Sequence, residues 1–91
     1  MSRLSGYSAS ATWNAASIAD GDEVAVEVTV PDAKLGDFAF ASLGVDIADA
    51  QLSADVTAAN TVTCVLSNST GGAVDLASTT LRVKVVPYEV I

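Results

Sequence analysis

The sequence predicts an all-β protein, a small antiparallel β-sandwich or a partly open, jelly-roll-like barrel with an extended N-terminal arm. Several short runs alternate apolar and polar residues, which is the period of a half-buried strand, and turn residues separate these runs. No segment carries the apolar period of an amphipathic helix over about ten residues. Ala and Val dominate the apolar residues, and aromatic residues make up 5% of the chain. The core is therefore expected to be thin, as in a flat sandwich.

The first ten residues are small and polar and have no period that would bury one face. We expect a flexible arm over residues 1–10, which either frays or becomes ordered on a partner. The chain has 91 residues, enough for one domain, predicted over residues 11–91. A domain of this size is marginally stable alone, so stabilisation by a partner surface is plausible.

The first clear strand is predicted over residues 22–30, where valines at every second position alternate with small or polar residues until Pro31. A shorter strand is predicted over residues 37–42. Phe38 and Phe40 share one of its faces, and two alanines occupy the other.

Residues 45–50 fit either a helical turn or a connection between strands. The runs over residues 51–57 and 61–67 alternate in the same way and are predicted to pair as a hairpin across a short connection. Cys64 lies in the second run and shares a face with Val62 and Leu66. A Gly-rich turn follows it.

The last strand is predicted over residues 80–86, with Arg82 and Lys84 facing solvent, and Pro87 ends it. Its inward residues are Leu81, Val83 and Val85. If this strand lies next to the run over residues 22–30, Glu27 is expected opposite Lys84 or Arg82.

The composition argues against an enzyme and gives no catalytic, cofactor-binding or metal-ligating set. The chain contains no His, which removes Ser-His-Asp and Cys-His catalysis and the commonest metal ligand. Eleven acidic residues place some carboxylates close together, but that follows from their number and is not a glycosidase signature. Cys64 is either a thiolate nucleophile or a small buried apolar residue, and its apolar neighbours favour the core.

Four other features have two interpretations each. Asp20–Glu23 is either a weak cation site or a charged turn, and the turn is favoured. Asn68-Ser69-Thr70 matches a glycosylation sequon, but turn chemistry is favoured. Trp13 is either part of the core or an interface anchor, and the core is favoured. Tyr88–Ile91 either extends its own strand or pairs with a sheet edge of a neighbouring subunit.

The net charge of −7 disfavours nucleic-acid binding, because the chain repels phosphates. The four basic residues, Arg3, Lys34, Arg82 and Lys84, form no cluster that would bind nucleic acid or an anionic membrane. The start of the chain has no apolar signal region, and no run of about 18 apolar residues occurs. We expect a soluble product of the cytoplasm that binds a neutral or basic protein surface.

Six segments resemble small β-domain structural proteins of tailed bacteriophage virions. They are Thr12–Asn14, Ile18–Gly21, Leu35–Phe38, Ala58–Val62, Asn68–Ala77 and Arg82–Val85, and together they span most of residues 11–86. All are turn and strand motifs and include no active site. Asn60 stands where that family commonly has Asp, and Ser78–Thr80 lacks a frequent Gly, which affects loop geometry more than the fold.

This resemblance implies a capsid decoration (cement) protein that is synthesised in the host cytoplasm. Such a protein binds the major capsid protein on the head surface as a homotrimer and stabilises the head without catalysis. The alternative is a carbohydrate- or receptor-binding module of a phage fibre or spike, whose glycan affinity would depend on exposed Trp13 or Tyr88. A hydrolase is a third hypothesis, and it requires an activity that carboxylate substitutions abolish.

Overall fold

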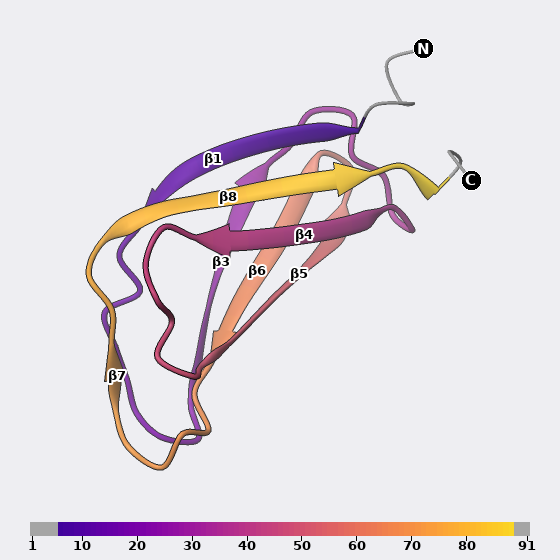
Figure 1. The fold of residues 1–91 in the computed structure, drawn as a ribbon. Helices are drawn as coiled ribbons and strands as arrows, with labels where there is room; N and C mark the ends of the chain where they lie inside the picture. Colours follow the sequence, from indigo (N-terminus) through magenta and orange to yellow (C-terminus); the bar gives the residue numbers. More distant parts are fainter. Residues whose placement is uncertain (1–5, 89–91) are drawn as a thin grey trace.

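The computed structural model describes residues 6–88, and every regular element of more than one residue in this range is a β-strand. No helix in the described range is long and apolar enough to cross a membrane. The strands are β1 (Tyr7–Trp13), β2 (Ser17–Ile18), β3 (Glu23–Thr29), β4 (Phe38–Leu43), β5 (Gln51–Ala58), β6 (Thr61–Ser67), β7 (Val74–Asp75) and β8 (Thr79–Val86), as Figure 1 shows.

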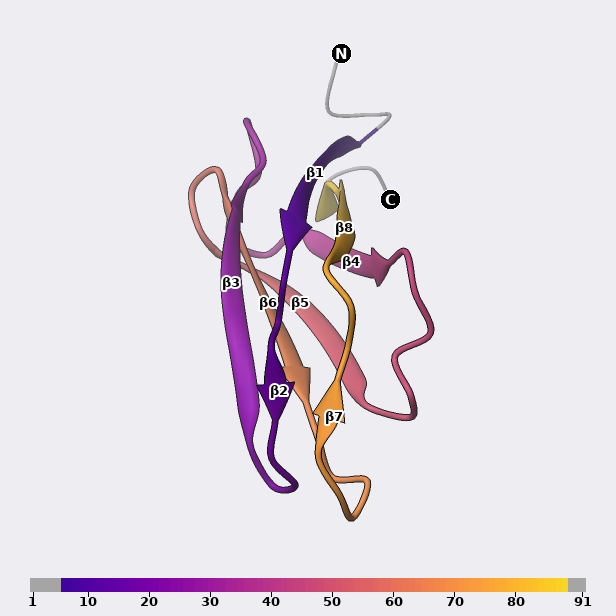
Figure 2. The same ribbon diagram turned by 90° about the vertical axis from the view of Figure 1, so that its left-hand side faces the viewer.

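Two antiparallel three-stranded sheets pack face to face, with strand orders β1-β8-β4 and β3-β6-β5. A short ribbon of β2 and β7 joins them at one end (Figure 2). The pairing is nested, because β1 pairs with β8, β2 with β7 and β3 with β6. A long ribbon that bends from one sheet into the other is typical of a jelly roll. The predicted antiparallel sandwich is therefore confirmed.

The N-terminal prediction was wrong for residues 7–10. These residues begin β1, and Tyr7, Ser8, Ala9 and Ser10 pair with Val85, Lys84, Val83 and Arg82 of β8. The strand does alternate, but its inward residues include two alanines and its outward ones are Ser and Thr, so the apolar contrast was weak. The remainder of the predicted arm, residues 1–5, lies outside the described residues.

The other predicted strands are present, and β5 and β6 form the predicted hairpin. The last strand does not lie next to β3, so the condition for a pair of Glu27 with Lys84 or Arg82 is not met. Segment 45–50 forms turns that connect β4 to β5, and residues 59–60 connect β5 to β6. Strand β3 pairs with β6, so Glu27 lies opposite Thr63 and not opposite Arg82 or Lys84. The order of the strands along the chain did not reveal this pairing, because the ribbon is nested.

The core lies between the two sheets and continues beneath the β2-β7 ribbon. Val62, Cys64 and Leu66 of β6 are completely buried, as are Leu81 and Val85 of β8. These inward faces are the ones that the alternating pattern predicted. Two clusters form the core: the first is Val28, Val30, Ala33, Val56, Val62, Cys64, Leu81, Val83 and Val85, and the second is Ala15, Ile18, Ala50 and Leu66.

Asn68 holds the corner where the ribbon bends between the sheets. Its backbone N–H donates to Asp22 O at 3.0 Å, and its carbonyl accepts from Gly21 N at 2.7 Å. Its side-chain Nδ2 donates to Ile18 O and to Gly72 O, both at 2.8 Å. These bonds tie the turn before β3 to the loop after β6.

Candidate docking surface

Cys64 belongs to the core and not to a reactive site. Its side chain is fully buried in the first core cluster. Burial in apolar surroundings disfavours the thiolate and raises the pKa of the Cys64 thiol above its ordinary value of 9.0. A nucleophilic thiol needs access and a lowered pKa, and Cys64 has neither.

The acidic stretch Asp20–Glu23 forms a hydrogen-bonded turn. Asp22 N donates to Ala19 O at 3.0 Å, and Asp22 Oδ1 accepts from Glu23 N at 3.1 Å. Asp20 Oδ1 accepts from Gly71 N at 3.0 Å. Across residues 6–88 no three His, Cys, Asp or Glu side chains gather in a way that would hold a metal ion. The favoured interpretation of this stretch, a charged turn, agrees with these contacts.

The sequon at Asn68-Ser69-Thr70 is also a turn. Asn68 is 1% exposed, and its Nδ2, the atom that glycosylation would modify, donates to two carbonyl oxygens. Its Oδ1 accepts from the N and the Oγ1 of Thr70, at 3.0 and 2.8 Å. The side chain therefore has a structural role.

Trp13 packs against both core clusters and is partly buried, which agrees with the core interpretation. Tyr88 is 49% exposed. The other residues of the predicted C-terminal segment, 89–91, lie outside the described residues. Of Trp13 and Tyr88, Tyr88 is therefore the aromatic residue that a partner reaches more easily.

The outer face of the β1-β8-β4 sheet carries basic and hydroxyl side chains in two rows across the strands. One row contains Ser8, Lys84 and Phe40, and the other contains Ser10, Arg82 and Ser42. Every member of both rows is exposed. We call these six residues the basic face. The sequence predicted that Arg82 and Lys84 face solvent, and the structure confirms it.

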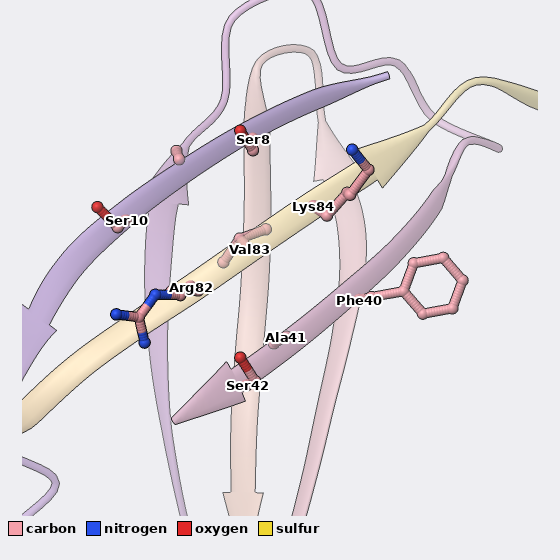
Figure 3. Close-up of a pocket in the computed structure, with 9 residues that line it drawn as sticks. Ser8, Ser10, Phe40, Ala41, Ser42, Arg82, Val83 and Lys84 are labelled. Carbon is pink, nitrogen blue, oxygen red and sulfur yellow. The ribbon is translucent and has the colours of Figure 1, made fainter. Parts of the chain in front are cut away.

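A shallow groove of about 560 Å³ follows the basic face, with Ser8 and Ser10 on one side, Phe40 and Ser42 on the other, and Arg82 and Lys84 between them (Figure 3). The Phe40 ring extends beyond β4, away from β8. Hydroxyls and cations therefore line the groove, and an aromatic ring flanks it.

Four large apolar side chains are exposed at or beside this groove, and we call them the apolar edge; one of them, Phe40, also belongs to the basic face. Leu35 is 65% exposed and Phe40 is 59% exposed. The apolar edge consists of Leu35, Phe38, Phe40 and Tyr88. The buried Asp37 carboxylate positions part of it, since Oδ2 accepts from Lys34 N at 3.1 Å and Oδ1 from Tyr88 N at 3.2 Å. These bonds hold the loop that carries Leu35 against the end of β8.

The outer face of the β3-β6-β5 sheet has the opposite charge. Glu23, Glu27 and Asp55 are exposed there, and Glu27 and Asp55 lie on either side of Thr63 in one row. The strand positions that face outward on this sheet include no Lys or Arg. We call the three acidic residues the acidic face.

The sequence predicted that Phe38 and Phe40 share a face, but not that this face is exposed. It also did not predict that Ser8 and Ser10 line the groove, because the strand that carries them was assigned to the arm.

No protein-family model, curated protein or solved structure matches this chain significantly.

Proposed function

We propose that this protein is a non-enzymatic virion structural protein, a capsid decoration protein that binds the major capsid protein and stabilises the assembled head as a homotrimer. The exposure of the apolar edge carries this proposal. Four large apolar side chains on one side of a small domain are typical of a protein interaction surface. The sequence resemblance to small β-domain proteins of phage virions gives the class of partner.

The energetics favour docking through the apolar edge. Burying exposed apolar surface contributes about 25 cal/mol per Å², and aromatic residues commonly dominate the binding energy of an interface. The loop that carries Leu35 is fixed by Asp37, so little ordering cost accompanies docking. A fixed apolar surface on a soluble acidic domain suits attachment across capsomer junctions.

Co-sedimentation with expanded heads of the phage that encodes this chain tests the proposal. The double variant F38S/F40S removes two exposed rings and is expected to weaken binding by about tenfold or more, since each interface aromatic contributes on the order of 1–2 kcal/mol. The matched control is Ala25→Ser, a small change on the exposed opposite face, with binding expected as in the wild type. Wild-type protein that stays in the supernatant with heads present, at every concentration, would contradict the proposal.

The basic face favours one second candidate, a carbohydrate-binding module. Serine hydroxyls, two cations and the exposed Phe40 ring supply hydrogen bonds and an apolar platform for a sugar. Screening the protein against immobilised acidic and neutral glycans tests this candidate. Binding that Phe40→Ser abolishes would support it, and a screen without binding would eliminate it.

A further inference from the structure

The two outer faces of the sandwich segregate charge in a way that the net charge of the chain does not reveal. The chain has four basic residues, and two of them, Arg82 and Lys84, lie together on the basic face. No acidic residue occupies an outward strand position of that sheet. The acidic face belongs to the other sheet of the sandwich, β3-β6-β5, and lies on the opposite side of the molecule. A molecule with a net charge of −7 thus carries one locally positive surface.

These charges are not satisfied within the described part of the chain. Arg82 and Lys84 form no ion pair with a carboxylate of residues 6–88, although acidic residues are abundant. The acidic residues Glu23, Glu27 and Asp55 likewise have no ion pair within that range. Both faces therefore remain available to a partner of opposite charge.

A second copy of this chain offers that opposite charge. Pairing two basic faces about a two-fold axis would bring Arg82 and Lys84 against the same residues of the other copy, and like charges in contact disfavour such an arrangement. Pairing the basic face of one copy with the acidic face of the next brings two cations to three carboxylates. Such a head-to-tail contact uses different surfaces on each copy and, because the two faces lie on opposite sides of the molecule, it joins copies in a row rather than in a closed ring.

We infer that copies of this protein associate head to tail, with the basic face of one copy on the acidic face of the next. The inference goes beyond the proposed function, since it concerns how copies of the chain contact one another and not how they bind the head. The groove between Ser8, Ser10 and Ser42 receives the carboxylates, and the serine hydroxyls donate to them.

The expected contact is weak in free solution. A face of three strands with about seven residues each measures roughly 10–15 by 20–25 Å, which is smaller than the ~800 Å² that each partner buries in a standard interface. Association should therefore depend on concentration and weaken as salt screens the charges. On a capsid surface, neighbouring docking sites would raise the effective concentration of the copies.

Charge exchange tests the inference by sedimentation equilibrium over a range of protein concentrations at low salt. Wild-type protein is expected to self-associate, and R82E/K84E and E27K/D55K are each expected to lower the association constant by about 10- to 100-fold. The quadruple variant R82E/K84E/E27K/D55K exchanges the signs of the two faces and keeps the net charge at −7. It is expected to recover association, which also shows that both pairs of substitutions permit folding.

Three results would overturn the inference: a wild-type monomer at all concentrations, a loss of association in R82E/K84E but not in E27K/D55K, or a quadruple variant that stays monomeric. The second result would place the basic face against a surface of the second copy other than the acidic face. Head binding through the apolar edge is measured separately. Wild-type protein that binds heads but does not self-associate contradicts only the head-to-tail contact, and wild-type protein that self-associates but does not bind heads contradicts only the proposed head binding.

Discussion

Asn68 is the buried polar side chain that joins three segments of the chain at one corner of the sandwich. Asn68→Ala removes the donors to Ile18 O and Gly72 O and the acceptor for Thr70. It removes the buried donor to Ile18 O, although Gly72 O keeps a hydrogen bond from Thr70 Oγ1, so we expect a loss of about 2–4 kcal/mol in the free energy of unfolding. Urea denaturation checks this value. The exposed neighbour Ser69→Ala is the control, expected within about 0.5 kcal/mol of the wild type. A loss below about 1 kcal/mol in Asn68→Ala would contradict this structural role.

Because the Cys64 thiol is buried, the free energy of unfolding depends on pH in the alkaline range. Burial raises the folded-state pKa of Cys64, so below its ordinary value of 9.0 the thiol is neutral in both states and its contribution to stability is complete. Above that pH the unfolded chain loses the proton first, and stability falls as pH rises. We expect the urea midpoint of the wild type to fall more steeply from about pH 9 upward than that of Cys64→Val. Equal slopes in the two proteins would show that the thiol ionises in the folded state.

The connection between β5 and β6 depends on Asn60, which has a φ of 63° and whose Oδ1 accepts from Asp32 N at 2.7 Å. Asn60→Asp keeps the acceptor and tolerates this backbone conformation, so we expect a change within about 0.5 kcal/mol. Asn60→Gly keeps the conformation but loses the hydrogen bond, which costs about 1 kcal/mol. Asn60→Ala loses both and should cost about 2 kcal/mol. Thermal unfolding ranks the three variants, and a different order would show that another interaction determines this turn.

The strands that the sequence predicted are those with strong apolar contrast, such as β3, where valines alternate with Glu and Thr. Strand β1 was missed because Ser and Ala alternate there, and a small apolar side chain marks an inward position only weakly. In β4, Phe and Ala differ in size rather than polarity. The pattern therefore showed which residues share a face, but not which face points into the core. Some Cα atoms of β4 and β5 lie within 8 Å of each other, so the two sheets approach closely there. Alanines fit this space and phenylalanines do not.

The sequence predicted the hairpin of β5 and β6, which the structure confirms, but it did not predict the other strand pairs, because the nested ribbon joins segments that are far apart in the chain. Ser17 pairs with Asp75, and Tyr7 pairs with Val85. Local periodicity specifies which residues point inward, but not which strand lies alongside, and strands as short as β2 and β7 have almost no period. For the same reason the orientation of Arg82 and Lys84 was predictable, whereas the serines that line the groove beside them were not.

At the scale of the whole molecule, function depends on how surfaces are distributed over a sandwich that measures 45 × 20 × 19 Å. Counting charges indicated an acidic protein that avoids nucleic acid. The fold places two of the basic residues on one face and three of the acidic residues on the opposite face, and it places the apolar edge at the basic face. The chain therefore combines a negative net charge with a basic contact surface. The net charge affects how folding responds to salt, and the basic face affects how self-association responds.

Salt should affect folding and self-association in opposite directions. The chain has eleven acidic and four basic residues, and the excess negative charges repel one another in the folded state. Raising NaCl from about 0.01 to 0.3 M screens this repulsion and therefore stabilises the fold. A gain of about 1 kcal/mol would raise Tm by roughly 4–8 °C for a domain of this size. The head-to-tail contact relies on attraction, so the same change in salt should lower the association constant. Calorimetry on dilute protein and sedimentation at higher concentration separate the two effects. If both quantities rose with salt, apolar contact rather than charge would join the copies.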